Sequence, residues 1–407
     1  MTEQYDVAVI GAGPSGSTAA HLLAEAGARV LVIERETFPR FHIGESLLPA
    51  SLDVFRRLGV EVVGKEHVKK AGAEFYEEAT GQFATYLFSD QLGGVPEYAY
   101  QVDRATLDQA LAQSAVRAGA ILHEGERVTG VDLDGGARPP IVATDRGRYE
   151  ARYVLDATGL DSLFAYSNDS RRRIEAFGLG AVFRHFGDLR PSIAAELLAQ
   201  GNIKVLFVDE GWIWAIPLGE GRLSVGLVTR HKGLKDEWLD AAIAASPEVS
   251  RILEGARPEG PHKKLASFSF YNPRAHGPRW SCIGDAACFL DPVFSSGVTF
   301  AMLGSTLAVE QLLPALAQGR EGDAALMDAH AEKMRNGYEV FATMINAIYR
   351  RRLLPGLFFT TDQNTELRKG LTSLLAGDVW RTDNAFLEKL WRSRLRVRLD
   401  DRGLSMV

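Results

Sequence analysis

Hydrophobic and polar positions follow two patterns along this chain, and the first one occupies the N-terminus. A short apolar run at residues 5–10 is followed by a glycine-rich turn, an alanine-rich segment at 17–26 and a second apolar run at 29–34. Continuous apolar runs of this length are typical of buried parallel strands, and an alanine-rich segment that ends at a glycine, here Gly27, is typical of a helix. The pattern predicts a strand–helix–strand unit.

Two later apolar runs, at residues 152–157 and 280–283, also predict parallel-type strands. The first ends in Asp156-Ala157-Thr158-Gly159, and the second is followed by Gly284-Asp285-Ala286. The N-terminal strand likewise ends at a glycine. Ligands of open parallel sheets bind at the carboxyl ends of the strands. Three such ends with glycine or aspartate therefore indicate one nucleotide site built from distant segments.

Between these strands the pattern changes to alternation, which predicts a separate antiparallel sheet. Strands at 203–208 and 222–228 are examples, and the chain after Met302 has a helical pattern. We expect an α/β fold with a discontinuous Rossmann-like nucleotide-binding domain, an inserted antiparallel-sheet substrate domain and a helical C-terminal region. The expected boundaries are 1–75, 98–175 and 277–330 for the first domain, 76–97 and 176–276 for the second, and 331–407 for the third.

Two tryptophans stand two residues apart in one of the alternating strands. Side chains at such a spacing share one face, so Trp212 and Trp214 are expected to line one wall. Proline cannot donate to a sheet ladder, so we expect the strand to stop or bulge at Pro217 and to present the wall at a sheet edge. Taken alone, the pair is equally compatible with two core aromatics.

Composition and charge narrow the class of protein. The chain has 407 residues, of which 46% are hydrophobic and 24% charged, as in ordinary globular proteins of about two domains. Its net charge of -6 argues against nucleic acid as a ligand, and we expect neither a signal peptide nor a membrane-spanning run. Cys282 and Cys288 suit reduced, buried thiols, and no spacing indicates a metal site. We expect a cytoplasmic protein.

The turn after the first strand carries the chemistry of a dinucleotide site. Gly11, Gly13 and Gly16 allow a tight turn, close approach of the backbone to a pyrophosphate, and close packing of helix on strand. The helix that follows turns its unpaired amides toward the phosphates. Glu34 ends the second strand, where a partner for a ribose hydroxyl belongs.

A late segment distinguishes FAD from NAD. Asp285 follows a predicted strand near a helix start and could bind the hydroxyls of the sugar chain, a contact that a simple NAD fold does not need. The helix that begins near Gly297 would direct its positive end at the flavin ring. Asp285 could also be only a helix cap. We expect FAD as the cofactor.

Three stretches resemble the flavin-dependent halogenases, within the glutathione-reductase-type FAD monooxygenase fold. Residues 38–46 end in a Gly-Glu-Ser that is similar to the family's segment beside the flavin. Residues 212–217 fit the signature WxWxIP at every specified position. Residues 284–298 are similar to the flavin and halide loop. The resemblance extends to about Leu312, and weakly to residues 376–380.

This resemblance implies the reaction. In the family, reduced flavin reacts with oxygen to a hydroperoxide, chloride or bromide attacks it, and hypohalous acid travels to a lysine near the substrate. Lys70 lies in a similar Lys-x-Gly-Ala stretch and would be that lysine, while Trp212 and Trp214 would keep the substrate from the flavin. Judged by its polar neighbours alone, Lys70 could instead lie on a plain surface.

The resemblance also implies the contacts of the cofactor and the halide. Ser296 and Gly297 would bind the halide through backbone amides at a helix start, although these residues are also simply favourable there. Ser46 would lie beside the flavin, Arg104 would hold the FAD and Val128 would meet the adenine. Arg104 could instead form a surface ion pair.

One departure from the family narrows the class of substrate to be expected. Tryptophan halogenases carry a glutamate just before their Ser-Thr-Gly, where this chain has Phe294 before Ser295-Ser296-Gly297. Phenols and pyrroles are electron-rich enough to need less stabilisation of the positive charge that develops on the ring. The chain therefore resembles the phenol and pyrrole branch more closely. It is also shorter than tryptophan halogenases, which suits a substrate tethered to an acyl or peptidyl carrier protein. Residues 331–407 carry more basic than acidic side chains, which could meet an acidic carrier.

The chain has one glycine-rich strand–helix–strand unit, so a second domain for NADPH is not indicated. We therefore expect a separate flavin reductase to supply reduced FAD. Three alternatives stay open: a hydroxylase or other FAD monooxygenase, a geranylgeranyl-reductase-like oxidoreductase, and a flavin-binding scaffold or redox sensor without a substrate.

Overall fold

The N-terminal unit is a parallel sheet with helices on its faces. The computed structural model describes residues 3–62, 67–209, 211–350, 358–359 and 365–406. Strand β1 (Glu3–Ile10) pairs in parallel with β2 (Val30–Glu34), and α1 (Pro14–Glu25) connects them. The expected strand–helix–strand unit is therefore confirmed. The sheet has the order β18-β19-β10-β1-β2-β7, and β8 and β9 extend it from β10. Its other strands are β7 (Ile121–Glu124), β8 (Val128–Asp132), β9 (Ile141–Thr144), β10 (Arg148–Asp156), β18 (His276–Gly277) and β19 (Trp280–Cys282).

The register of this sheet brings three distant strand ends together. Ile10 of β1 lies opposite Asp156 of β10, and Asp156 lies opposite Cys282 of β19. All three strands run in parallel, so the segments that follow them meet at one edge of the sheet. The nucleotide site predicted from distant segments thus has its geometric basis. Cys282 and Cys288 are both free and buried, as expected.

Helix α1 packs against α3 (Arg104–Arg117) and α8 (Gly297–Ala317). Among the described residues α8 alone is long and apolar enough, by length and composition, to cross a membrane, which corrects the expectation that no segment is. In this fold 56% of its most apolar stretch is buried inside the protein. A helix that is buried on most sides needs apolar residues around its whole circumference, which explains the composition.

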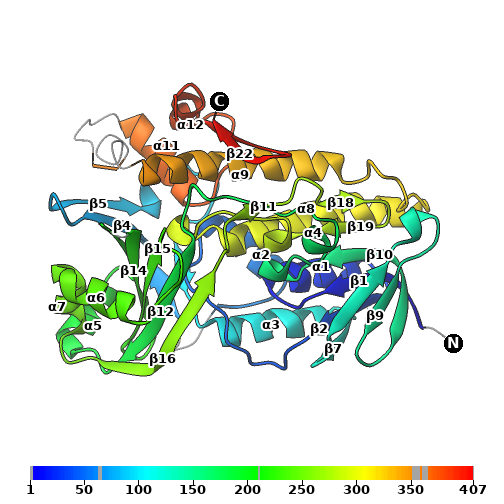
Figure 1. Ribbon diagram of the computed structural model, residues 1–407, viewed down its shortest axis with the longest axis horizontal. Coiled ribbons are helices and arrows are strands. Elements are labelled where there is room, and N and C mark those ends of the chain that lie inside the picture. Colours follow the sequence, from blue (N-terminus) through cyan, green and yellow to red (C-terminus); the bar gives the residue numbers. More distant parts are fainter. Residues whose placement is uncertain (1–2, 63–66, 210, 351–357, 360–364, 407) are drawn as a thin grey trace.

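The second sheet has seven strands in the order β16-β12-β15-β14-β13-β4-β5. Its neighbours are antiparallel, as expected, except that β13 and β4 run in parallel. Figure 1 shows this sheet at one end of the molecule and the N-terminal unit at the other. Its strands are β4 (Gly72–Glu77), β5 (Gln82–Leu87), β12 (Gly180–Gly187), β13 (Ile203–Val208), β14 (Gly211–Leu218), β15 (Arg222–Thr229) and β16 (Arg257–Ala266).

The two faces of this sheet belong to different cores. Ile213 and Ala215 of β14 pack in a core with residues of three short helices on the outer face, α5 (Pro191–Leu198), α6 (Glu237–Ala245) and α7 (Pro247–Leu253). Trp212 and Trp214 alternate with them and join the main core of the molecule. The expectation that both indoles share one face is confirmed.

The position of Pro217 differs from the expectation. Strand β14 continues through Pro217 to Leu218, and it lies in the middle of the sheet between β15 and β13, not at an edge. The pairing with β13 ends at Ala215, so on that side Pro217 has no partner to which an N–H would donate. A central strand therefore tolerates the proline.

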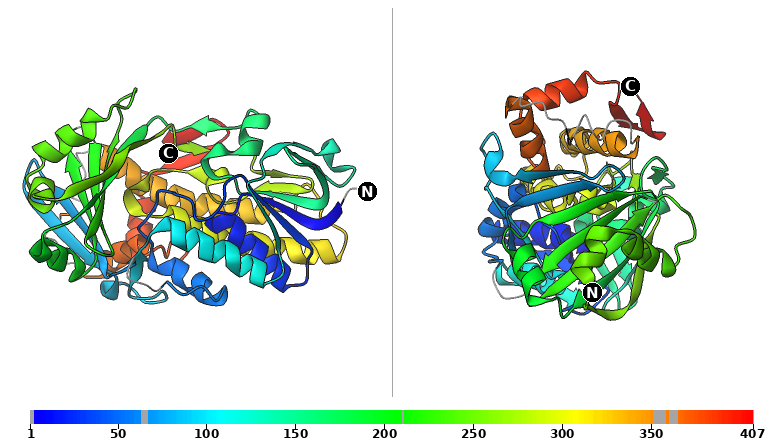
Figure 2. Two further views of the ribbon diagram at one scale, coloured as in Figure 1. Left: turned by 90° about the horizontal axis from the view of Figure 1, so that it is seen from below. Right: turned by 90° about the vertical axis from the view of Figure 1, so that its left-hand side faces the viewer.

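The C-terminal region is mostly helical and covers one side of the molecule, as Figure 2 shows. It contains α9 (Asp328–Tyr349), α11 (Thr365–Leu375), α12 (Ala385–Trp391) and a hairpin of β21 (Val397–Asp400) and β22 (Gly403–Met406). The division of the chain into three domains stays a prediction, and its boundary between residues 75 and 76 falls within β4. The remaining elements are α2 (Leu52–Arg57), β3 (Val68–Lys70), β6 (Ala99–Gln101), α4 (Leu163–Ser167), β11 (Arg172–Arg173), β17 (Phe270–Tyr271) and β20 (Cys288–Phe289).

Candidate active site

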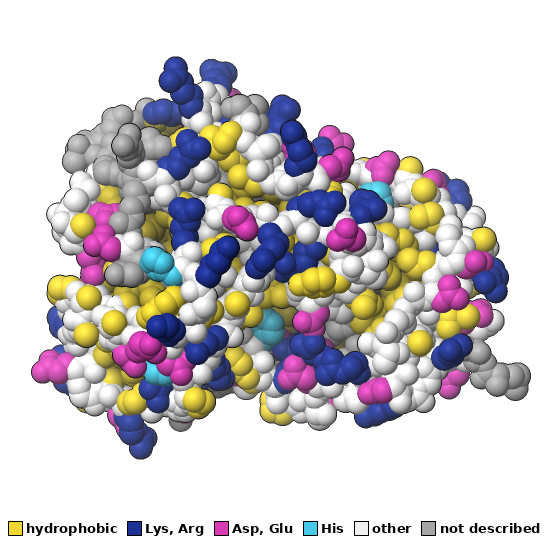
Figure 3. Space-filling model, in the orientation of Figure 1, with side chains coloured by type: hydrophobic (Ala, Val, Ile, Leu, Met, Phe, Trp, Pro, Cys, Tyr) yellow, Lys and Arg dark blue, Asp and Glu magenta, His cyan; other side chains and the backbone are white. Residues whose placement is uncertain are grey.

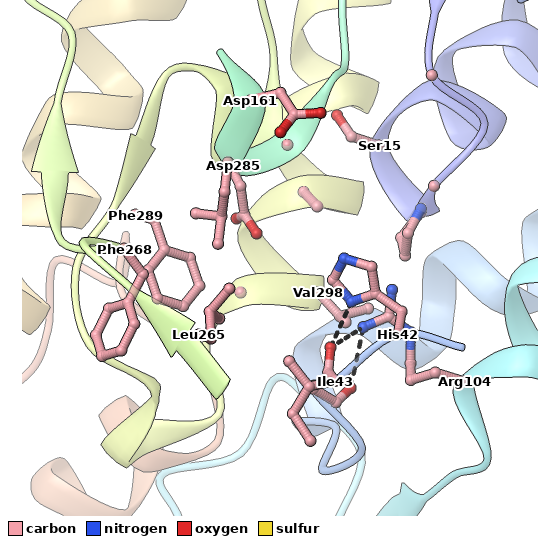
Figure 4. A pocket seen from close by; sticks show the side chains of 18 of the residues that line it. Ser15, His42, Ile43, Arg104, Asp161, Leu265, Phe268, Asp285, Phe289 and Val298 are labelled. Carbon is pink, nitrogen blue, oxygen red and sulfur yellow. Dashed lines mark hydrogen bonds between the residues drawn. The ribbon is translucent and has the colours of Figure 1, made fainter. Parts of the chain in front are cut away.

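A cavity of about 420 Å³ extends from the glycine-rich turn to the inner face of the second sheet. Figure 4 looks into it, with Phe268, Phe289 and Asp285 on one side and His42 and Arg104 on the other. Of the residues proposed from the sequence, Gly11, Gly13, Glu34, Ser46, Arg104, Val128, Trp212, Trp214, Asp285 and Gly297 line it. The fold thus brings together most of the predicted site.

The three glycines of the turn are required for different reasons. Gly11 has a φ of +99°, and a Cβ there would lie 2.5 Å from the Ala157 carbonyl oxygen. A Cβ at Gly16 would lie 1.9 Å from the Gly11 oxygen, so this glycine permits the packing of α1 on the turn. At Gly13 a Cβ would meet no described atom closer than 3.7 Å and would occupy cavity space instead. The turn therefore leaves room for a ligand at Gly13.

Helix α1 begins at this turn with Pro14 in its first turn and without a side-chain cap among the described residues. Its first amides are therefore available to an anion. Glu34 is buried beside the turn, where one carboxylate oxygen accepts from the Ala12 amide at 2.9 Å and the other from the Glu36 amide at 3.0 Å. Glu34 thus stabilises the turn as well as facing the cavity.

Arg104 is buried rather than on the surface. Its guanidinium donates to both carboxylate oxygens of Asp108, at 2.8 and 2.9 Å, and to the carbonyl oxygens of Ile43 and Gly44 at 2.9 and 3.2 Å. It therefore holds the loop at residues 40–46 against α3. Burial alone would lower the pKa of Arg104, but the charge of Asp108 raises it, so the guanidinium stays charged.

Asp285 and His42 face the cavity from opposite sides (Figure 4). Burial raises the pKa of Asp285 to about 6, and the charge of Arg104 opposes this shift. The His42 side chain is exposed to the cavity, and desolvation by the surrounding protein together with the charge of Arg104 lowers its pKa to about 4. The cavity is lined by charged side chains such as Glu34 and Arg104 as well as by apolar ones, which suits a large ligand with polar and apolar parts.

The start of α8 forms another wall of the cavity. Ser296 is the residue before the helix, Gly297 is its first residue, and Ser295 has a left-handed φ of 57°. Ser295 and Gly297 line the cavity, whereas Ser296 lies outside the described residues that do so. Asp291 stabilises the preceding turn by accepting from the amides of Val293 and Gly178, both at 3.1 Å.

The two tryptophans close the cavity toward the second sheet. Their ring centroids lie 6.0 Å apart, and the side chains are 1% and 4% exposed. The indole N–H of Trp214 donates to the Ser224 hydroxyl at 3.1 Å. Gly226 makes room for this ring, since a Cβ there would lie 2.2 Å from it. The wall is therefore fixed by its neighbours on β15.

Lys70 is fully buried at the end of β3, which excludes the surface alternative. Its ammonium donates to the Ser46 hydroxyl at 2.8 Å and the Leu47 carbonyl at 2.9 Å, and lies 5.3 Å from the Phe88 ring centroid. Burial lowers the pKa of Lys70 to about 7. Lys70 lies outside the described residues that line the cavity, but Ser46, which it contacts, is one of them.

Several cavity residues escaped the sequence reasoning. Phe183, Phe268 and Phe289 line the cavity, and His185 of β12 contacts Glu45 from the sheet. Glu45 lies within the quoted Gly-Glu-Ser stretch, but His185 stands 140 residues later in a strand without a motif. Only the alternation of β12 could have suggested its face. Among the described residues no group of three potential ligands could hold a metal ion.

Comparison with known proteins identifies the family. The chain matches the tryptophan halogenase family over residues 6–90 and 65–386. It is 29% identical to a 1H-pyrrole-2-carbonyl-[peptidyl-carrier protein] chlorinase of Pseudomonas fluorescens, over 92% of this chain and 90% of the relative.

Two solved structures share the fold closely. One is a flavoprotein/dehydrogenase of Cytophaga hutchinsonii, with a TM-score of 0.84 and 27% identity over 95% of this chain and 96% of that one. The other is the flavin-dependent brominase Bmp2, with a TM-score of 0.81 and 27% identity over 95% and 97%. The halogenase interpretation is thus supported over the hydroxylase and geranylgeranyl-reductase alternatives. The chain belongs to the tryptophan halogenase family and is an FAD-dependent halogenase.

Proposed function

We propose that this protein oxidises chloride or bromide in the cavity and delivers hypohalous acid through Lys70 to an electron-rich aromatic substrate, a phenol or pyrrole. The observation that carries the proposal is the tryptophan wall. Trp212 and Trp214 line the same cavity as Gly13 and Asp285, so they stand between the cofactor end and the rest of the second sheet. An organic substrate is sterically kept away, while a small oxidant can leave.

The residues present fit FAD. Gly13 leaves space where a Cβ would intrude, and the uncapped start of α1 suits a pyrophosphate. Gly11 and Gly16 shape that turn, and Glu34 faces the place of a ribose. We assign Asp285 to the sugar-chain hydroxyls, and Ser46, Arg104 and Val128 to the remaining contacts. When bound in its reduced form, FAD supplies, with oxygen and halide, the hypohalous acid of the reaction.

The start of α8 is the proposed halide site. Backbone amides of Ser296 and Gly297 lie at the positive end of a 21-residue helix, and no described side chain caps it. An anion is favoured at such a helix start, and a partly enclosed cavity strengthens the interaction. Gly297 lines the cavity directly, so the halide would approach from the cofactor side.

We propose that Lys70 receives the oxidant beyond Ser46. With a pKa of about 7, about half of the Lys70 side chains are neutral amines at neutral pH. The ammonium can donate a hydrogen bond to hypohalous acid, and the amine can be halogenated by it. Burial excludes bulk water and so limits loss of the oxidant.

The substrate proposal rests on residues and relatives together. Phe294 stands where tryptophan halogenases have a glutamate, which removes the expected partner of an indole. This chain covers 90% and 92% of the length of two relatives that act on a pyrrole bound to a peptidyl carrier protein. We therefore propose a phenol or pyrrole substrate tethered to an acyl or peptidyl carrier protein. We also propose a separate flavin reductase as the source of reduced FAD and a cytoplasmic location.

A basic surface suits such a carrier. Lys and Arg side chains gather across the middle of the face in Figure 3. Arg172 contacts the backbone of Asp401 and Arg350 contacts Met406, both in the C-terminal hairpin, while Arg230 lies over the Tyr349 ring at the end of α9. We define the basic surface as Arg172, Arg173, Arg230 and Arg350.

The test compares Lys70→Ala with a matched control, Lys69→Ala. Lys69 is the exposed neighbour, and its ammonium lies over the Tyr98 ring. Purified protein receives reduced FAD, oxygen, bromide and an electron-rich phenol or carrier-bound pyrrole, and products are identified by mass. We expect halogenation to fall about 100-fold or more in Lys70→Ala only. Halogenation that survives in Lys70→Ala would refute its role, and hydroxylation without halogenation by the wild type would refute the function.

A further inference from the structure

Glu45 and His185 form a buried pair that joins the two halves of the molecule. The Nε2 atom of His185, on β12, lies 2.6 Å from the Oε1 atom of Glu45, in the loop before Ser46. The side chains are 14% and 3% exposed, respectively. Glu45 lines the cavity, so the pair connects the cavity with the second sheet.

The second oxygen of Glu45 is unsatisfied. Its Oε2 atom is buried and has no hydrogen-bond partner among the residues that the structure describes. Buried polar atoms in native proteins are almost always hydrogen-bonded, so an exception in a residue that lines a ligand cavity requires an explanation. The oxygen is free to exchange a proton with a group or a water that enters the cavity.

The other side of His185 leads toward the surface. Its Nδ1 atom lies 3.3 Å from Arg222, whose side chain is 29% exposed. The Phe41 ring lies 5.9 Å from the imidazole and is 43% exposed, so it only partly covers the pair. A short path therefore runs from solvent through His185 to Glu45 and the cavity.

Several charges surround the pair and shape this path. Arg222 is itself paired with Glu259 at 3.0 Å and lies 3.7 Å from Asp103. The negative charge of Glu45 contributes to raising the pKa of Arg104 and opposes the burial that lowers the pKa of Lys263. The charged groups that face the pair are thus Arg104 of α3, Arg222 of β15 and Lys263 of β16.

We propose that Glu45 and His185 deliver the proton that each turnover consumes. The inference rests on the proposed halogenase reaction, in which reduced FAD, oxygen, halide, one proton and the substrate C–H yield oxidised FAD, two waters and the C–X product. In this relay the Glu45 carboxylate is protonated only transiently, and the O–H bond of the carboxyl breaks as its proton completes a water in the cavity. Protonated His185 restores the carboxyl through Nε2, and the imidazole regains its proton from solvent.

The experiment uses Glu45→Gln, His185→Gln and a matched control, His262→Gln. His262 forms a similar pair with Asp240, at 3.0 Å, but neither residue of that pair lines the cavity, whereas Glu45 does. We expect the bromination rate with reduced FAD to fall about 10- to 100-fold in the first two variants only. Binding of oxidised FAD and the thermal unfolding midpoint should stay within error of the wild type for Glu45→Gln.

Two measurements distinguish proton delivery by the Glu45–His185 pair from a purely structural role of its hydrogen bond. Added imidazole should raise the bromination rate of a His185→Ala variant at least tenfold. It should leave the rate of Glu45→Gln unchanged. In the FAD-free protein with 15N-labelled histidine, a hydrogen bond of 2.6 Å should give a downfield ring proton that His185→Gln lacks.

Wild-type rates in both Glu45→Gln and His185→Gln, or no rescue of His185→Ala by imidazole, would overturn the relay. An equal loss in His262→Gln would also overturn it, because proton delivery predicts no effect there. Failure of the wild type to halogenate the phenol or carrier-bound pyrrole would instead refute the proposed function on which the relay rests.

Discussion

Burial decides the protonation state of Lys70. The side chain is 1% exposed, and its two hydrogen-bond acceptors, the Ser46 hydroxyl and the Leu47 carbonyl, are neutral. No described carboxylate pairs with it, and its pKa is lowered because burial removes the ammonium from water. A lysine in this state costs stability whenever it must be charged in the folded protein.

This cost predicts a specific pH dependence of stability. The pKa of Lys70 is about 7 when folded and 10.5 when unfolded, so between these values the unfolded state binds more protons and stability rises with pH. The full effect is on the order of 5 kcal/mol. We expect Lys70→Met to be more stable than the wild type at pH 7, with a difference that shrinks toward pH 10.

Urea unfolding at pH 7 and at pH 9.5 measures this difference. Lys69→Met is the control, because it removes the exposed neighbouring lysine instead of the buried one. A Lys70→Met protein that is less stable than the wild type at pH 7 would show that the hydrogen bonds to Ser46 and Leu47 outweigh the cost of the buried charge.

The same residues show what sequence could predict. The glycines of the turn lie in a short local motif whose spacing carries their chemistry, whereas only the resemblance to a family stretch points to Lys70. Resemblance placed Arg104 near the cavity, but not its bond to Asp108 or its hold on the loop at 40–46. The contact of Glu45 with His185 depends on how β12 faces a loop 140 residues away, and no local pattern contains that information.

At the scale of elements, β14 shows the limit of reasoning from one residue. The alternation of Trp212, Ile213 and Trp214 correctly predicted a strand with two different faces. Pro217 suggested an edge, but neighbouring strands of unequal length left it without a partner on one side. Which strands neighbour β14, and how far they run, is set by tertiary structure rather than by the strand itself.

The two faces of β14 allow a sharp test of the tryptophan wall. We expect Trp212→Ala and Trp214→Ala to bind FAD but to release more hydrogen peroxide and less halogenated product, because water and substrate gain access to the cavity. Peroxide and product are measured together for each oxygen consumed.

Ile213→Ala is the matched control from the opposite face of the same strand. Ile213 is fully buried in the outer core, so its truncation should cost about 2–5 kcal/mol of stability without changing the ratio of peroxide to product. If the tryptophan variants also lose the fold or FAD binding, the indoles act as core residues and the shielding role is wrong.

At the scale of the whole molecule, the cavity lies where the N-terminal unit meets the inner face of the second sheet. Its lining residues come from β1, α1, β2, the segment after β10, β14 and the start of α8, so segments from the first to the last third of the chain build one site. The C-terminal helices and hairpin lie along one side of this assembly (Figure 2). The basic surface lies beside that hairpin and the end of α9, and a large partner can approach it without entering the cavity.

This arrangement predicts that the charge of the basic surface affects the rate of halogenation of a carrier-bound substrate but not that of a free one. We expect Arg230→Glu combined with Arg350→Glu to slow halogenation of a carrier-bound pyrrole about tenfold or more at low salt, because like charges then meet an acidic carrier. Turnover of a free phenol should not change. Added salt should slow the wild type with the carrier-bound substrate and narrow its advantage over the variant, since exposed charges are screened over about 8 Å at 0.15 M.

The control reverses an exposed arginine elsewhere, Arg320→Glu, just beyond the end of α8. It changes net charge in the same direction but lies outside the basic surface, so it should leave the carrier-bound rate unaltered. Equal losses in Arg320→Glu and the double variant would mean that net charge, not this surface, guides the carrier. If the free phenol reacts while the carrier-bound pyrrole does not react even with the wild type, the substrate is not carrier-bound.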